Sequence, residues 1–129
     1  MSENKKIVAC YARVGRNSME QKGHLKEGEA LLSQVGRCSS FIAQKKEWQA
    51  GPIYMDIAST GDLERSGYQQ MLKDAWSGKF HVLVVTDFDR LTRNLSEGMR
   101  MVRAFTKGLG IQISLLGREG RRANAKRSN

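Results

Sequence analysis

Apolar residues in this chain occur either in short continuous runs or at helical spacing, and the two patterns alternate from end to end. Continuous runs of strand length occupy residues 7–14, 53–57, 80–85 and 111–116. Runs this short and this uniformly apolar are typical of strands buried on both faces. The sequence therefore predicts four strands.

Between these runs, apolar residues recur three and four positions apart, which predicts three helices. Their ranges are 25–48, 68–76 and 95–109. Gly28 and Gly36 lie inside the first range, and each glycine costs about 1 kcal/mol relative to alanine, so an irregular or broken helix is expected there. Gly51 and Pro52 predict a loop between this helix and the second strand, and Gly78 ends the second helix.

The predicted order of elements is strand, helix, strand, helix, strand, helix, strand. Helices that cross between parallel strands cover both faces of a sheet, which explains why the strands are apolar throughout. We expect an α/β fold with an open, mainly parallel sheet of four or slightly more strands flanked by helices. In such folds the ligand site lies at the carboxyl ends of the strands.

The apolar pattern stops after Leu116. Residues 117–129 include five basic residues and one acidic residue, and none of their side chains could form a core. A chain of 129 residues is long enough for one domain. We expect a domain at 1–116 followed by a flexible basic arm, in which the candidate DNA-binding residues are Arg118, Arg121, Arg122, Lys126 and Arg127.

Composition narrows the class of partner. The chain has 22 lysines and arginines against 13 acidic residues, a net charge of +9. Such an excess in a small protein favours DNA or RNA as the partner, although a basic surface can also serve solubility alone. No apolar run approaches the roughly 20 residues of a membrane helix, so no membrane association is expected.

The two cysteines, Cys10 and Cys38, form neither a CxxC pair nor a zinc-binding array with histidines. We interpret them as reduced thiols in a cytoplasmic protein. The start of the chain also lacks the apolar segment of a secretory signal.

Polar residues follow three of the predicted strands at the edge where a ligand site is expected. Arg13 follows the first strand; Asp56, Ser59 and Arg65 follow the second; and Asp89, Arg90 and Arg93 follow the third. Arg90 and Arg93 lie three positions apart at what we expect to be a helix start, near the positive end of the helix dipole. Paired guanidinium groups there form a phosphate-sized anion site, with Asp56 and Asp89 orienting the arginines.

Each of these features also has a simpler interpretation. Two arginines on an exposed helix are often only solvated, and aspartates that follow strands often cap helices. It is the combination over three strand ends that points to a site.

These residues carry a resemblance to a known family. Four segments resemble motifs of the catalytic domain of serine recombinases, the resolvase/invertase family, and more closely the large serine recombinases of mobile elements. They are Tyr11–Val14 (YARV), Asp56–Ser59 (DIAS), Arg65–Gly67 (RSG, with serine in place of the family's proline) and Asp89–Asn94 (DRLTRN), the most specific of the four. The resemblance extends from about Ile7 to Leu116.

The resemblance implies site-specific DNA recombination, with DNA integration among its uses and with neither metal nor nucleotide cofactor. In the family a serine hydroxyl attacks a DNA phosphodiester and forms a phosphoserine link, and the reverse attack rejoins the strands. The arginines would then surround the scissile phosphate and stabilise its transition state; they are Arg13, Arg65, Arg90 and Arg93. Asp89, in the same motif, is also counted among the catalytic residues. The implied partners are DNA and other recombinase subunits, as a homodimer where a dimerisation helix is supplied.

One departure from the family concerns the chemistry directly. The family's nucleophile follows the YARV motif, and here that position is Gly15, which has no side chain. Ser18 is a candidate displaced nucleophile, and Tyr11 a more remote one. A second departure is that the family's long helix and DNA-binding domain do not follow Leu116.

Three hypotheses therefore stand. The first is an active recombinase domain, either the catalytic part of a longer protein or a variant that uses Ser18. The second is a non-catalytic resolvase-like protein that binds DNA or modulates a recombinase. The third is a Mg²⁺-dependent phosphoryl hydrolase built on Asp56, Asp87 and Asp89. Arginines in the same cleft oppose the third hypothesis because they repel a divalent cation.

Overall fold

The computed structural model describes residues 5–15, 24–57, 65–92 and 94–116. Its four strands are β1 (Lys6–Val14), β2 (Trp48–Ile57), β3 (Val82–Val85) and β4 (Gln112–Leu115). Its helices are α2 (His24–Ala43), α3 (Ser66–Trp76) and α4 (Leu95–Arg103), with a 3-10 turn η1 (Phe88–Arg90) and a π-helical turn η2 (Ala104–Gly108). None of the described helices is both long and apolar enough to span a membrane.

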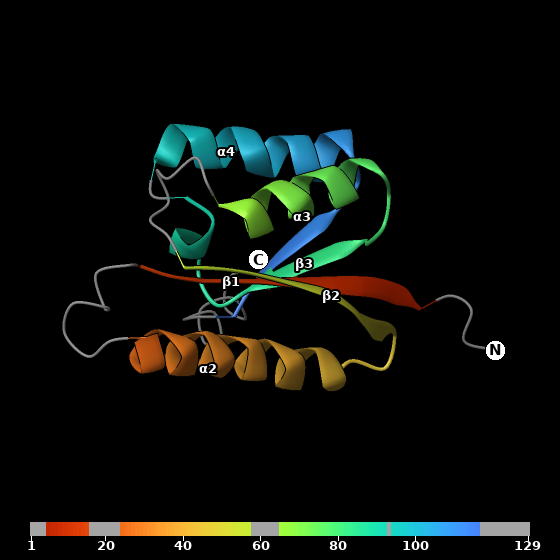
Figure 1. The fold of residues 1–129 in the computed structure, drawn as a ribbon. Helices are drawn as coiled ribbons and strands as arrows, with labels where there is room; N and C mark the ends of the chain where they lie inside the picture. The colour runs from red at the N-terminus through yellow and green to blue at the C-terminus, as the bar shows by residue number, and fades with distance from the viewer. Residues whose placement is uncertain (1–4, 16–23, 58–64, 93, 117–129) are drawn as a thin grey trace.

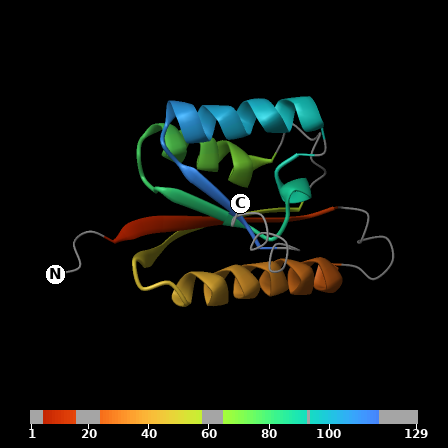
Figure 2. The same ribbon diagram turned by 180° about the vertical axis from the view of Figure 1, so that it is seen from behind.

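The strands form one parallel sheet in the order β2-β1-β3-β4. Helix α2 covers one face, and α3 and α4 cover the other (Figures 1 and 2). This confirms the predicted α/β fold with an open parallel sheet and flanking helices. Because β1 and β3 are the central strands, their residues are the most deeply buried.

Alternation along β1 sends its residues to two separate cores. Val8 and Cys10 pack against α2 together with Cys38, which is buried and free, as is Cys10. Ala9 and Tyr11 belong to the core on the opposite face, beneath α3 and α4. Arg13 lies two residues beyond Tyr11 and is therefore on the α3/α4 face, at the carboxyl end of the strand.

The predicted boundary between the first helix and the second strand is wrong. Helix α2 ends at Ala43 and β2 already begins at Trp48, so Gly51 and Pro52 lie inside the strand. The pairing with β1 shifts register there, which identifies a bulge. An edge strand tolerates proline at a bulge because no neighbour needs its missing N–H.

The predicted break in the first helix is also wrong, because α2 is continuous over 20 residues. A Cβ at Gly28 or Gly36 would meet no atom within 4 Å, so neither glycine marks a kink or a close approach. Packing of the apolar face of α2 outweighs their low helix propensity. Trp76, expected on the apolar side of the second helix, is 71% exposed.

The third helix begins at Leu95, as the apolar spacing predicts, so the expectation that Arg90 lies at its start is wrong. Arg90 lies in η1, and α4 starts at Leu95 after Asn94, whose side chain accepts a hydrogen bond from the Glu97 amide (3.0 Å). Asn94 is an extended N-cap residue, so the chain before it cannot belong to the same helix. Arg90 is therefore not on the first turn of α4.

Candidate active site: an arginine cluster at the carboxyl edge of the sheet

Three arginines from separate segments meet at the main chain of Asp89–Leu91. Arg13 donates from Nε to the Arg90 carbonyl (3.2 Å) and from Nη2 to the Asp89 carbonyl (3.0 Å). Arg65 donates from Nη2 to the Arg90 carbonyl (3.3 Å) and to the Leu91 carbonyl (3.0 Å). Arg90 in turn donates from Nη1 to the Arg13 carbonyl (2.9 Å). We call Arg13, Arg65 and Arg90 the arginine cluster.

Burial differs among the three arginines. Arg13 is 7% exposed and Arg65 4%, whereas the side chain of Arg90 is 28% exposed. Buried charges require hydrogen-bond partners, and main-chain carbonyls supply them here. Arg90 is thus the member of the cluster most open to a ligand. The buried guanidinium groups of Arg13 and Arg65 both contact its main-chain carbonyl.

The Arg90 side chain also lies beside the carboxylate of Asp87. Arg90 Nε and Asp87 Oδ1 are 3.4 Å apart, within ion-pair distance, but neither buried atom has a hydrogen bond of good geometry. The contact is therefore a Coulombic one without a defined hydrogen bond. A third group that can accept from Arg90 Nε would satisfy this donor.

Gln34 of α2 fixes the backbone at Arg13. Its side-chain oxygen accepts from the Arg13 amide (3.0 Å), and its side-chain nitrogen donates to the Arg13 carbonyl (2.9 Å). The same carbonyl accepts from Arg90 Nη1. Helix α2 therefore orients the end of β1 through a buried amide, although it covers the opposite face of the sheet.

Asp56, at the end of β2, organises the start of α3. Its Oδ1 accepts from the Gly67 amide (2.8 Å), and its Oδ2 accepts from the Tyr68 amide (2.9 Å) and the Tyr11 hydroxyl (2.7 Å). The Asp56 carboxylate, on strand β2, thus caps the N-terminus of α3 and complements the positive end of the helix dipole. A Cβ at Gly67 would lie 2.6 Å from the Met55 carbonyl, so this close approach requires glycine.

The Tyr11 hydroxyl connects Asp56 to the arginine cluster. It donates to Asp56 and accepts from Arg65 Nε (3.3 Å) and Nη2 (3.2 Å). Burial, followed by the hydrogen bond to Asp56, raises the pKa of Tyr11 well above its ordinary value. Tyr11 therefore stays a neutral donor at neutral pH, between a carboxylate and a guanidinium.

Gly15 directly follows β1, and the structure gives no steric reason for a glycine there. Its φ is not positive, unlike those of Gly78 and Gly110. A Cβ at Gly15 would meet no atom within 4 Å. A side chain that begins with a Cβ, such as that of serine, therefore meets no contact at its first atom.

The structure brings together some of the predicted site residues. Arg13, Arg65 and Arg90 meet, and Asp56 reaches them through Tyr11. The side chain of Asp89 is exposed, and its main-chain carbonyl is the group that accepts from Arg13. Outside the described residues lie Ser18, Ser59, Arg93, Arg118, Arg121, Arg122, Lys126 and Arg127.

Within the described ranges, no three His, Cys, Asp or Glu residues are grouped so that they could hold a metal ion. Asp56, which the magnesium hypothesis needs, already uses both oxygens for hydrogen bonds to Tyr11 and α3.

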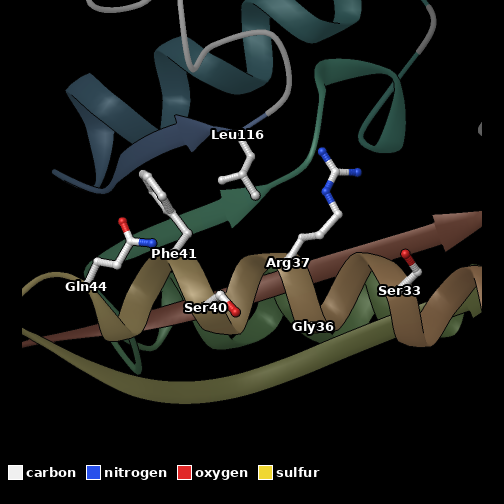
Figure 3. Close-up of a pocket in the computed structure, with 7 residues that line it drawn as sticks. All are labelled: Ser33, Gly36, Arg37, Ser40, Phe41, Gln44 and Leu116. Atoms are coloured by element: carbon white, nitrogen blue, oxygen red, sulfur yellow. The ribbon is translucent and has the colours of Figure 1, made fainter.

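A separate groove of about 580 Å³ lies between α2 and Leu116, the residue that follows β4. Figure 3 shows Arg37 and Phe41 extending from α2 toward Leu116. This groove contains no member of the arginine cluster.

Sequence reasoning missed three contributors to the site. Tyr11 is predicted from the sequence only as a remote candidate nucleophile, and neither Gln34 nor Tyr68 is singled out. Tyr11 could have been found because it lies two residues before Arg13 on the same strand and so shares its face. Nothing in the sequence pattern marks Gln34, because its role depends on where α2 crosses the sheet.

With this geometry established, comparisons with known proteins identify the class. The model of the resolvase N-terminal domain family matches residues 8–128, so the chain belongs to that family. This agrees with the resemblance to serine recombinases. A comparison with curated proteins gives no match.

Similar solved structures are catalytic domains of serine recombinases. The C-terminal catalytic domain of ISC1926 TnpA, an IS607-like serine recombinase, is 21% identical with a TM-score of 0.70, over 95% of this chain and 77% of that one. The N-terminal catalytic domain of TP901-1 integrase is 26% identical with a TM-score of 0.69, over 86% and 77%. A serine recombinase from Sulfolobus solfataricus is 22% identical with a TM-score of 0.62, over 96% and 76%. The chain is thus a resolvase-family domain with the fold of serine recombinase catalytic domains.

Proposed function

We propose that this domain binds a backbone phosphate of DNA at the arginine cluster and does not cleave the DNA itself. It would act as a non-catalytic member of the resolvase family that occupies DNA or modulates a recombinase. Arg13 and Arg65 both donate to the Arg90 carbonyl, and the Arg90 side chain donates to the Arg13 carbonyl. This meeting of three arginines, beside a glycine at the nucleophile position, is the observation that carries the proposal.

The electrostatics of the cluster support binding of a phosphate. Arg90 is the partly exposed member, and its guanidinium matches the geometry of a phosphate oxygen pair. Arg13 and Arg65 add two charges in a low-dielectric environment, where their field on a nearby anion is stronger than in water.

The side chain at residue 15 decides the chemistry. Transfer of a phosphoryl group to the protein needs a nucleophilic atom within about 3 Å of phosphorus, and glycine provides none. Loss of a nucleophile costs on the order of 10⁶ in rate even when the surrounding groups are retained. The binding half of the family's site would therefore persist without the cleavage half.

Charge beyond the cluster supports nonspecific DNA affinity. The chain carries a net charge of +9, and five of its basic residues are the arm candidates between Arg118 and Arg127. Contacts of this kind release counterions, so the affinity would fall steeply as salt increases. We propose that the arm holds the duplex and that the cluster engages one phosphate.

A binding titration of the full chain with a short DNA duplex tests this proposal. Replacing Arg90 by glutamine should weaken binding roughly tenfold at low salt, because a charge-assisted phosphate contact is lost. The matched control is Arg103→Gln, an exposed arginine in the last turn of α4. Equal effects of the two substitutions, or no binding by the parent chain at low salt, would contradict the proposal.

A further inference from the structure

We propose that Tyr68 is a positioning residue for Arg65, acting as an aromatic platform that fixes the plane of the guanidinium. Arg65 Cζ lies 3.9 Å from the centroid of the Tyr68 ring, which is face-to-cation contact. This deepens the proposed function, on which its consequence for DNA binding rests.

The Tyr68 ring and the hydrogen bonds restrain the Arg65 guanidinium in different ways. Nε and Nη2 of Arg65 are held by the Tyr11 hydroxyl, and Nη2 also reaches the Arg90 and Leu91 carbonyls. All of these bonds lie along the edge of the guanidinium. The Tyr68 ring lies against the face of the guanidinium, where it opposes tilting about that edge.

Tyr68 is itself anchored at both ends. Its amide donates to Asp56 Oδ2 (2.9 Å), and its hydroxyl contacts Met101 Sδ at 3.3 Å. Its ring also packs edge-on against Tyr11, with centroids 5.7 Å apart. The ring is therefore rigid before any ligand arrives, which is a requirement for a residue that orients another.

The arrangement links the start of α3 to the arginine cluster. Asp56 holds the α3 backbone at Tyr68, and Tyr68 then supports the side chain of Arg65, which lies just before the helix. A displacement of the first turn of α3 would tilt Arg65. Tyr68 thus transmits the position of this helix to the phosphate-binding groups.

Nuclear magnetic resonance of the labelled full chain tests the contact directly. The Tyr68 ring current should shift the Arg65 side-chain Nε–Hε signal, which is assigned by its loss in Arg65→Lys. The shift should persist in Tyr68→Phe, which keeps the ring, and become much smaller in Tyr68→Leu, which leaves only the more distant Tyr11 ring, 5.6 Å from Arg65 Cζ. Phe41→Leu is the control, because Phe41 stacks on Lys45 elsewhere and should leave the signal unchanged.

DNA titrations of the same variants test the consequence. Tyr68→Leu should weaken binding roughly fivefold to tenfold and Tyr68→Phe less than twofold. If Tyr68 acts through Arg65, Tyr68→Leu should add little to the loss caused by Arg65→Lys, as a double-mutant cycle measures. A full additional loss in that background would overturn the positioning role.

The remaining outcomes are also decisive. The inference is overturned if the Arg65 Nε–Hε signal of the parent chain has the chemical shift of a solvent-exposed arginine. It is also overturned if no nuclear Overhauser contacts join this guanidinium to the Tyr68 ring. Both results can be obtained even if Tyr68→Leu fails to fold. Ring-dependent shifts without DNA binding by any variant would support Tyr68 as a positioning residue and overturn the proposed function.

Discussion

Replacing Asp56 by alanine should destabilise the domain more than any other single polar substitution around the arginine cluster. The Asp56 carboxylate is 7% exposed and accepts three hydrogen bonds, from the Gly67 amide, the Tyr68 amide and the Tyr11 hydroxyl. Alanine would leave all three donors without their acceptor. The change would also remove the negative charge at the N-terminus of α3.

The size of the effect follows from these contacts. A hydrogen bond to a charged group contributes about 1.5–3 kcal/mol, and water can enter to satisfy part of what is lost. We expect Asp56→Ala to lower the free energy of unfolding by about 4 kcal/mol. Asp56→Asn should cost about 1–2 kcal/mol, because an amide keeps one accepting oxygen where Tyr11 and Tyr68 now share Oδ2.

Urea unfolding followed by circular dichroism measures both variants. The transition midpoint should shift in the order parent, Asp56→Asn, Asp56→Ala, with an unchanged dependence on urea concentration. A loss below about 1 kcal/mol for Asp56→Ala would refute the reasoning, because it would mean that the three donors find equal partners without the carboxylate.

Three further predictions concern other parts of the fold. Burial is the main cause that raises the pKa of every tyrosine in the chain above 10, so near-ultraviolet titration should show less phenolate at pH 10 in the folded protein than in the unfolded chain. Stability should fall as pH rises above 10. The Tyr54 hydroxyl lowers the pKa of Asp74 below 3.8 through a 2.6 Å hydrogen bond, so the stability advantage of the parent over Tyr54→Phe should be full at neutral pH and shrink as pH falls below 3.8. Gly98→Ala places a Cβ 2.4 Å from the Phe88 ring and should cost about 1–3 kcal/mol in thermal or urea unfolding, whereas Gly108→Ala, with open space, should not.

How far the sequence predicts this fold depends on which strands are central. The run at 7–14 and the run at 80–85 are apolar throughout because β1 and β3 are covered on both faces, and both were predicted. The edge strand β2 has exposed residues and contains Pro52, so its first half looked like a loop. Its pairing to β1 depends on a neighbour distant in sequence, which local pattern does not contain.

The candidate site shows the same division between local and distant information. The strand-end rule predicted that Arg13, Arg65 and Arg90 would share one edge of the sheet, and they do. The hydrogen-bond partners of these arginines were not predictable, because they are main-chain carbonyls of a 3-10 turn. The type of a residue does not determine the direction of its main-chain carbonyl. The sequence therefore predicts that the arginines lie near one another but not which groups they bind.

The most direct test of the central claim is covalent trapping on a nicked DNA duplex. The parent chain should form no protein–DNA adduct, whereas Gly15→Ser, whose Cβ would meet no atom within 4 Å, should form one that Arg90→Gln abolishes. An adduct formed by the parent chain and lost in Ser18→Ala would contradict the account, because the nucleophile would then lie elsewhere in the same protein.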